Sequence, residues 1–151
     1  MFERIVLAID GADEAGGAIA ATVDLARKSG GEVLVVHVGD QGDGGHAEAG
    51  AGADTRLMAS VLDAVRAQGV TARSELRTSP APGVAREILL AAGEFEADAI
   101  VLGSRRLGAF AGLLLGSVAY KVIQLADCPV MVVKPVGVAS EAGEPSTALP
   151  A

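Results

Sequence analysis

The sequence predicts an α/β protein in which a five-stranded parallel sheet is covered by helices on both faces. Five short apolar runs recur along the chain, and segments with apolar residues at helical spacing separate them. Strands that alternate with helices are joined by right-handed crossovers, so the strands are expected to run parallel. The chain has 151 residues, the size of one domain, and 50% of them are apolar, as a packed core requires.

The first half of the chain is expected to contain two buried strands. Residues 4–10 and residues 32–38 are almost wholly apolar, which is typical of strands covered on both faces. A helix between them is expected to be capped by Asp13 and to end at Gly30-Gly31. Residues 39–53 are rich in glycine and lack periodicity, which predicts a mobile loop before the second helix.

The second half continues the alternation of strands and helices. A helix that ends at Gly69 is followed by residues 70–77, whose alternating polarity predicts a half-exposed strand near the sheet edge. Residues 98–103 and 129–134 predict two more strands, and residues 117–126 a helix between them. A further helix is expected between residues 83 and 98. The apolar positions expected to face the core in these three helices are Met58, Val61, Leu62 and Val65 in the first, Val84, Ile88, Ala91 and Phe95 in the second, and Val118, Val122 and Leu125 in the third. We expect residues 1–136 to form the domain and residues 137–151 a flexible tail.

Composition excludes several classes of partner. The net charge of −7 opposes binding to phosphate backbones, and 3% aromatic residues offer little stacking, so no nucleic-acid partner is expected. No apolar run approaches the roughly 20 residues that span a bilayer. The first residues enter a strand pattern at once, so no secretory leader is expected. Cys128 is the only cysteine, which suits a reducing cytoplasm and predicts a structural thiol. His37 lies in an apolar strand and is interpreted as a hydrogen-bonded core residue.

The most informative segment for function runs from Gly103 to the last strand. A glycine ends a strand, a loop follows, and Gly116-Ser117 opens a helix. The free N–H groups and partial positive charge of a helix N-terminus suit an anion, and Gly116 lets a phosphate approach the backbone. The alternative is that Ser117 is simply an N-cap and that the glycines serve turns. Asp10, at the end of the first strand, either accepts hydrogen bonds from a ligand or caps the turn.

This segment resembles the nucleotide-binding end of the universal stress protein family. ATP-binding members carry a glycine, two residues, a second glycine, nine residues, and then Gly-Ser or Gly-Thr. Gly103 matches the first position and Gly116-Ser117 the last two, while Arg106 replaces the second glycine. The runs I-V-L-A-I-D-G, V-L-V-V-H-V and C-P-V-M-V-V are also similar, and the resemblance covers residues 2–135.

The resemblance implies a strand order of 3-2-1-4-5, a homodimer formed through the last strand (residues 129–134), and ATP as ligand, with or without magnesium. Arg106 would either obstruct the phosphates or pair with them. The adenine and ribose region would be lined by Ala8, Ile9, Asp10 and Val38. The phosphates and ribose would be surrounded by Gly103, Gly116, Ser117 and Val118.

Little or no hydrolysis is expected, because the sequence offers no general base, P-loop lysine or magnesium-binding carboxylate pair. The main alternative is a dimeric interaction module of the same fold that does not depend on nucleotide. A third possibility is a weak hydrolase in which Asp10 orients water. The spacing of Asp40, Asp43, His46 and Glu48 matches no standard metal site. No motif in the sequence identifies a protein partner or the stress to which the protein would respond.

Overall fold

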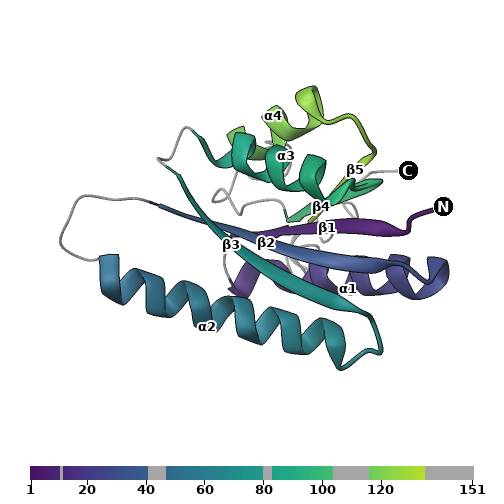
Figure 1. Ribbon diagram of the computed structural model, residues 1–151, viewed down its shortest axis with the longest axis horizontal. Coiled ribbons are helices and arrows are strands. Elements are labelled where there is room, and N and C mark those ends of the chain that lie inside the picture. Colours follow the sequence, from purple (N-terminus) through teal and green to yellow (C-terminus); the bar gives the residue numbers. More distant parts are fainter. Residues whose placement is uncertain (11, 41–46, 80–82, 104–115, 135–151) are drawn as a thin grey trace, which may run out of the picture.

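The computed structural model describes residues 1–10, 12–40, 47–79, 83–103 and 116–134, and Figure 1 shows their arrangement. The elements in chain order are β1 (Arg4–Ile9), α1 (Ala12–Ser29), β2 (Glu32–Asp40), α2 (Ala47–Arg66), β3 (Ala72–Ser79), α3 (Val84–Phe95), β4 (Ala99–Gly103), α4 (Ser117–Leu125) and β5 (Val130–Val133). The strands form one parallel sheet in the order β3-β2-β1-β4-β5. The predicted fold class and strand order are therefore confirmed.

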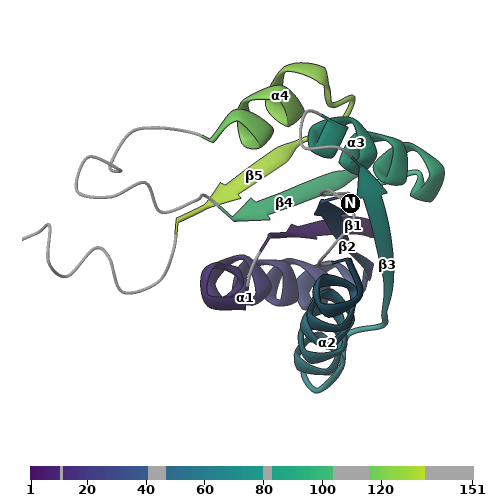
Figure 2. The same ribbon diagram turned by 90° about the vertical axis from the view of Figure 1, so that its left-hand side faces the viewer.

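Helices cover both faces of the sheet, with α1 and α2 on one side and α3 and α4 on the other (Figure 2). The central strand β1 shows why both layers form. Ile5, Leu7 and Ile9 pack into the core beneath α1 and α2, whereas Val6 and Ala8 pack beneath α3 and α4. Successive side chains of a strand point to opposite faces, so a continuous apolar run serves two cores at once.

Two helix starts differ from the sequence expectation. α2 begins at Ala47 and β2 extends to Asp40, so the expectation of a loop over residues 39–53 is wrong for residues 39–40 and 47–53, while residues 41–46 lie outside the described part. Alanine has the highest helix propensity but makes no periodic apolar stripe, which explains why apolar periodicity did not indicate a helix over residues 47–53. α1 begins at Ala12, so Asp13 lies inside its first turn and is not the cap.

One expected core position is also wrong. Leu125 is 65% exposed, although Val122, one turn earlier on α4, is fully buried. Leu125 is the last residue of α4, and α4 lies over the end of the sheet at which β5 is the edge strand. Periodicity assigns a face to a residue but does not show where the layer beneath it ends.

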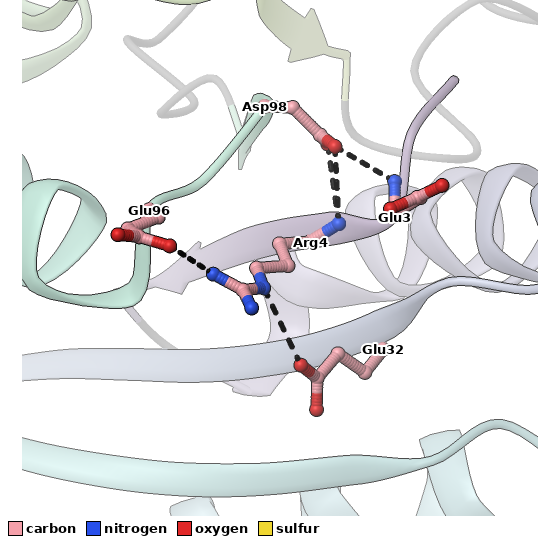
Figure 3. Close-up of polar contacts among 5 residues, drawn as sticks. All are labelled: Glu3, Arg4, Glu32, Glu96 and Asp98. Carbon is pink, nitrogen blue, oxygen red and sulfur yellow. Dashed lines mark hydrogen bonds and ion pairs between the residues drawn. The ribbon is translucent and has the colours of Figure 1, made fainter.

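Charged side chains fix the amino edge of the sheet, as Figure 3 shows. The Asp98 carboxylate accepts hydrogen bonds from the backbone N–H groups of Glu3, at 2.8 Å, and Arg4, at 3.2 and 3.3 Å. The Arg4 guanidinium pairs with Glu96, and its Nε lies 3.8 Å from Glu32. These contacts join the start of β1 to both neighbouring strands and so hold its register.

A second charged cluster ties α3 to the edge strand β3. Arg77 donates hydrogen bonds to Glu75 (2.7 Å), Glu87 (3.0 Å) and Glu94. Burial alone would lower the pKa of Arg77, but the hydrogen bonds to Glu87 and Glu75 outweigh it and the pKa is raised. β3 is half-exposed as expected for an edge strand: Ala72 and Ser79 at its ends are buried, and the residues between them are exposed or partly buried. The Arg77 cluster covers part of the face toward α3.

None of the described helices is long and apolar enough to cross a membrane. The expected flexible tail, residues 137–151, lies outside the described residues.

Candidate functional site

The strand order reverses between β1 and β4, the point at which ligands bind in open α/β sheets. Ala8 of β1 is in register with Leu102 of β4, so the chain segments that follow, Ile9-Asp10 and Gly103, leave the sheet side by side. The structure therefore brings together at one edge the strand-end residues that the sequence analysis selected.

These strand-end residues offer mainly backbone atoms. Ala8, Ile9 and Val38 are 7%, 7% and 9% exposed, so their side chains belong to the two cores. Asp10 is exposed and is the charged side chain that directly follows β1. A ligand at this edge would meet the Asp10 carboxylate and the carbonyl and amide groups of the strand ends.

The second part of the predicted site is the N-terminus of α4. Gly116 is the N-cap, in an extended conformation with φ −61° and ψ 159°, and no side chain caps the helix in the described part of the chain. Ser117 is the first helical residue and is exposed, so the alternative that Ser117 is the N-cap is wrong by one position. The first intrahelical bond runs from the Tyr120 N–H to the Gly116 carbonyl at 3.0 Å. The helix itself therefore provides no acceptor for the amides that precede Tyr120.

The described residues leave room for a side chain at Gly116. A Cβ placed there would meet no described atom within 4 Å, so the glycine is not required by packing among these residues. Val118, by contrast, is half-buried and packs against the core under α3 and α4. Among the described residues, the first turn of α4 thus begins at a glycine without a side chain and is anchored by the apolar side chain of Val118, an arrangement that suits phosphate oxygens.

His37 confirms its interpretation as a hydrogen-bonded core residue, and it brings in a partner that the sequence analysis missed. The ring is 5% exposed; its Nδ1 lies 2.8 Å from the Ile9 carbonyl oxygen and its Nε2 lies 3.1 Å from Asp54 Oδ1. Asp54 belongs to α2. A histidine near the end of an apolar strand and an acidic residue in the next helix were the available signals.

Several other candidates cannot be placed or have no partner for chemistry among the described residues. Arg106, Asp43 and His46 lie outside the described residues, and no metal-binding group of three or more His, Cys, Asp or Glu side chains occurs within the described ones. Burial raises the pKa of the Cys128 thiol, and the charges of Asp98 and Asp127 raise it further. A protonated, half-buried thiol is a poor nucleophile, in agreement with the predicted structural role.

Comparisons with known proteins agree with this geometry. Residues 1–134 match the model of the universal stress protein family. The universal stress protein in the QAH/OAS sulfhydrylase 3′ region of Thermus aquaticus is 37% identical over 139 residues, covering 89% of this chain and 100% of that protein. A universal stress protein structure from Archaeoglobus fulgidus superposes with a TM-score of 0.74 at 28% identity, covering 89% of this chain and 100% of that one. An A. fulgidus universal stress protein in complex with dAMP gives a TM-score of 0.69 at 27% identity, covering 88% and 98%.

Proposed function

Because the chain belongs to the universal stress protein family, we propose that it binds an adenine nucleotide, ATP in the first place, at the carboxyl edge of its sheet. The observation that carries the proposal is the N-terminus of α4, where Gly116 is an extended N-cap and no side chain of the described residues accepts a hydrogen bond from the first turn. This helix leads to β5, the strand beside β4. The A. fulgidus relative in complex with dAMP supports the adenine class of ligand.

Each part of the nucleotide has a matching group. The N–H groups of Ser117 and Val118 and the Ser117 hydroxyl would donate to phosphate oxygens, with Gly103 leaving space for their approach. Asp10 would accept hydrogen bonds from the ribose or the adenine, beside the backbone at Ala8, Ile9 and Val38. Magnesium, when present, would arrive with the triphosphate, since the described residues contain no metal-binding cluster of their own.

We further propose that the protein acts by binding, with little or no hydrolysis, as a cytoplasmic homodimer paired through β5. β5 is an edge strand of four residues, and Met131 within it is 44% exposed. An edge strand with an open row of backbone groups is a natural pairing surface. The Met131→Lys variant should shift the sedimentation coefficient from dimer to monomer; an unchanged dimer would place the interface elsewhere.

The alternative, a nucleotide-independent interaction module, is favoured by the apolar side chains exposed on α4. Tyr120, Ile123 and Leu125 are 55%, 45% and 65% exposed. The two functions are separated by denaturing the purified protein, analysing it for released adenine nucleotide, and titrating ATP with and without magnesium. Retained or titratable nucleotide supports the first proposal, whereas no binding at about millimolar ATP, the weak end of specific recognition, supports the second.

Two variants refine the assignment. Arg106→Gly restores the family's second glycine, so tighter ATP binding would show that Arg106 obstructs the phosphates and weaker binding that it pairs with them. Asp10→Asn removes a charge but keeps an acceptor. We expect this variant to bind ATP more weakly than the wild type, and we expect neither protein to hydrolyse ATP. If the wild type hydrolyses ATP and the variant does not, the result would instead support the weak hydrolase.

A further inference from the structure

We propose that His37 and Asp54 share one proton in a positioning latch that holds the end of β1, and with it Asp10, in place for the nucleotide. Loss of this proton as the pH rises is inferred to weaken nucleotide binding. The inference rests on the proposed function for its effect on affinity, but the latch itself is a property of the protein without ligand.

The hydrogen-bond partners of the ring determine how many protons it needs. A backbone carbonyl only accepts, so Nδ1, at 2.8 Å from the Ile9 oxygen, must carry a hydrogen. A carboxylate also only accepts, so Nε2, at 3.1 Å from Asp54 Oδ1, is satisfied only with a second proton between the two atoms. A neutral ring with an ionised Asp54 has one hydrogen for two acceptors. Either tautomer then sets a nitrogen lone pair against an oxygen.

Burial makes this mismatch costly. The His37 side chain is 6% exposed and that of Asp54 is 31% exposed, so water has little access to replace a lost partner on the ring. A buried polar atom without a partner loses the full benefit of its hydrogen bond. Removal of the shared proton is therefore expected to open the contact between β2 and α2, and not to leave it as a weaker hydrogen bond.

The position of the latch links it to the site. Ile9 is the last residue of β1 and the last to pair with β2, where its register partner is His37 itself. The bonded carbonyl belongs to the peptide group that leads into Asp10. Holding this carbonyl fixes the direction in which the chain leaves the sheet, which is where the proposed site needs the Asp10 carboxylate.

Gly39 provides room for the latch. A Cβ at Gly39 would lie 2.8 Å from Asp54 Oδ2, closer than real Cβ atoms approach an oxygen. The carboxylate therefore lies against the bare backbone of β2, two residues beyond His37. The Gly39→Ala variant would displace the carboxylate without altering either partner of the shared proton.

Asp54 is the charged side chain that contacts the ring within the described part of the chain. On β1, Asp10 is exposed and follows the bonded carbonyl. On β3, Glu75 and Arg77 face the opposite side of the sheet, where Arg77 bonds to α3. The charged residues of α1 whose burial the structure describes lie in its second half, whose Ser29 hydroxyl donates to the Phe2 carbonyl at the far edge of the sheet. The other charged residues of α2 whose burial the structure describes are exposed: Arg56, Asp63 and Arg66.

The test compares ATP affinity from about pH 5 to about pH 9, which brackets the ordinary titration of histidine. In the wild type we expect affinity to fall about tenfold toward alkaline pH, the factor that accompanies loss of one charged hydrogen bond that orders the site. Asp54→Asn should bind well and show no such fall. Its amide can donate to the neutral ring or accept from the charged one, so both states are satisfied.

Asp54→Leu and Gly39→Ala should instead bind weakly across the whole range. Asp63→Asn, an equal change of charge at an exposed position of the same helix, is the matched control and should follow the wild type. Protonation of the ATP phosphates at the acidic end is common to all variants and cancels in the comparison. If Asp54→Asn keeps the pH dependence of the wild type, the shared proton is not its source and the proposal is overturned.

A second measurement needs no nucleotide. In ¹⁵N-labelled protein, the amide shift of Asp10 should change with the titration of the His37 ring in the wild type and in Asp63→Asn, but not in Asp54→Asn. If the Asp10 amide is indifferent to the ring in the wild type, the latch is refuted. If the latch titrates as expected but no variant binds ATP, the proposed function fails and the latch stands.

Discussion

Replacing Gly116 by valine tests whether a nucleotide approaches the first turn of α4. Gly116 has φ −61° and ψ 159°, a conformation open to every L-residue, so valine brings no backbone strain. A Cβ at this position meets no described atom within 4 Å. The described part of the protein therefore has room for the side chain, and a steric effect on affinity must arise from the ligand.

The cost to stability is confined to helix capping. Glycine is a better N-cap than alanine or valine, so Gly116→Ala and Gly116→Val should each lower the free energy of unfolding by about 0.5–1 kcal/mol. The two variants are thus matched in stability and differ in bulk. Displacing a phosphate from a backbone N–H loses a charge-assisted hydrogen bond of about 1.5–3 kcal/mol. That loss corresponds to a decrease in affinity of about 10- to 150-fold.

The assay is calorimetric titration with ATP, with urea unfolding as the control for folding. Gly116→Val should lose affinity by the factor given above, and Gly116→Ala should lose clearly less because its methyl group is smaller. A folded Gly116→Val protein that binds ATP as tightly as the wild type would refute the placement of the phosphates at this helix.

Three further predictions concern stability. A Cβ at Gly31 would collide with the Phe2 carbonyl oxygen, whereas a Cβ at Gly93 meets no described atom within 4 Å. Urea unfolding should show Gly31→Ala destabilised by about 1–3 kcal/mol and Gly93→Ala stabilised by about 0.5–1 kcal/mol. The reverse order of stability would contradict the packing. Asp98→Ala deprives two backbone N–H groups at the start of β1 of their acceptor and should cost about 1–3 kcal/mol, with ATP affinity unchanged in calorimetry. Because the pKa of the Cys128 thiol is raised in the folded protein, the unfolded chain releases this proton at a lower pH than the folded protein does. The free energy of unfolding should therefore fall as the pH rises above about 8.5. Unfolding curves of Cys128→Ala should lack that part of the pH dependence.

β1 and β2 were predictable because each of these strands has to be buried on both faces. Residues 4–10 and 32–38 can form almost continuous apolar runs only if two helical layers cover them, and the structure places β1 and β2 there. The order of the strands could not come from this signal, since parallel strands buried on both faces have similar sequences. It came from the resemblance in glycine spacing and strand motifs, which carries information about topology that periodicity lacks.

Apolar periodicity missed the start of α2 and the exposure of Leu125 for two different reasons. An alanine- and glycine-rich segment forms no apolar stripe, so its helix is invisible to periodicity even where its backbone propensity is high. At the end of α4, periodicity assigns Leu125 to the face toward the sheet, but the sheet does not extend beneath this residue.

The candidate site divides in the same way. The spacing from Gly103 to Gly116 selected the first turn of α4. A ligand that is bound by backbone groups requires glycine at set positions, and such positions can be read from the sequence. The pairing of His37 with Asp54 has no such signal in the sequence. The two residues are 17 positions apart, and their contact depends on where α2 begins and on the missing side chain at Gly39.

The two edges of the sheet are built for different tasks. At the amino edge, Asp98 and Arg4 hold β1 through charged hydrogen bonds that are complete without a ligand. At the carboxyl edge, α4 begins with amides that the helix leaves without acceptors, and β1 ends on a carbonyl held by His37. The first edge can therefore stabilise the fold without a ligand, while the second is the edge at which we propose that the nucleotide binds. Substitutions at Asp98 should therefore change stability and leave affinity unchanged, and substitutions at Gly116 should do the reverse, apart from the small cost of capping.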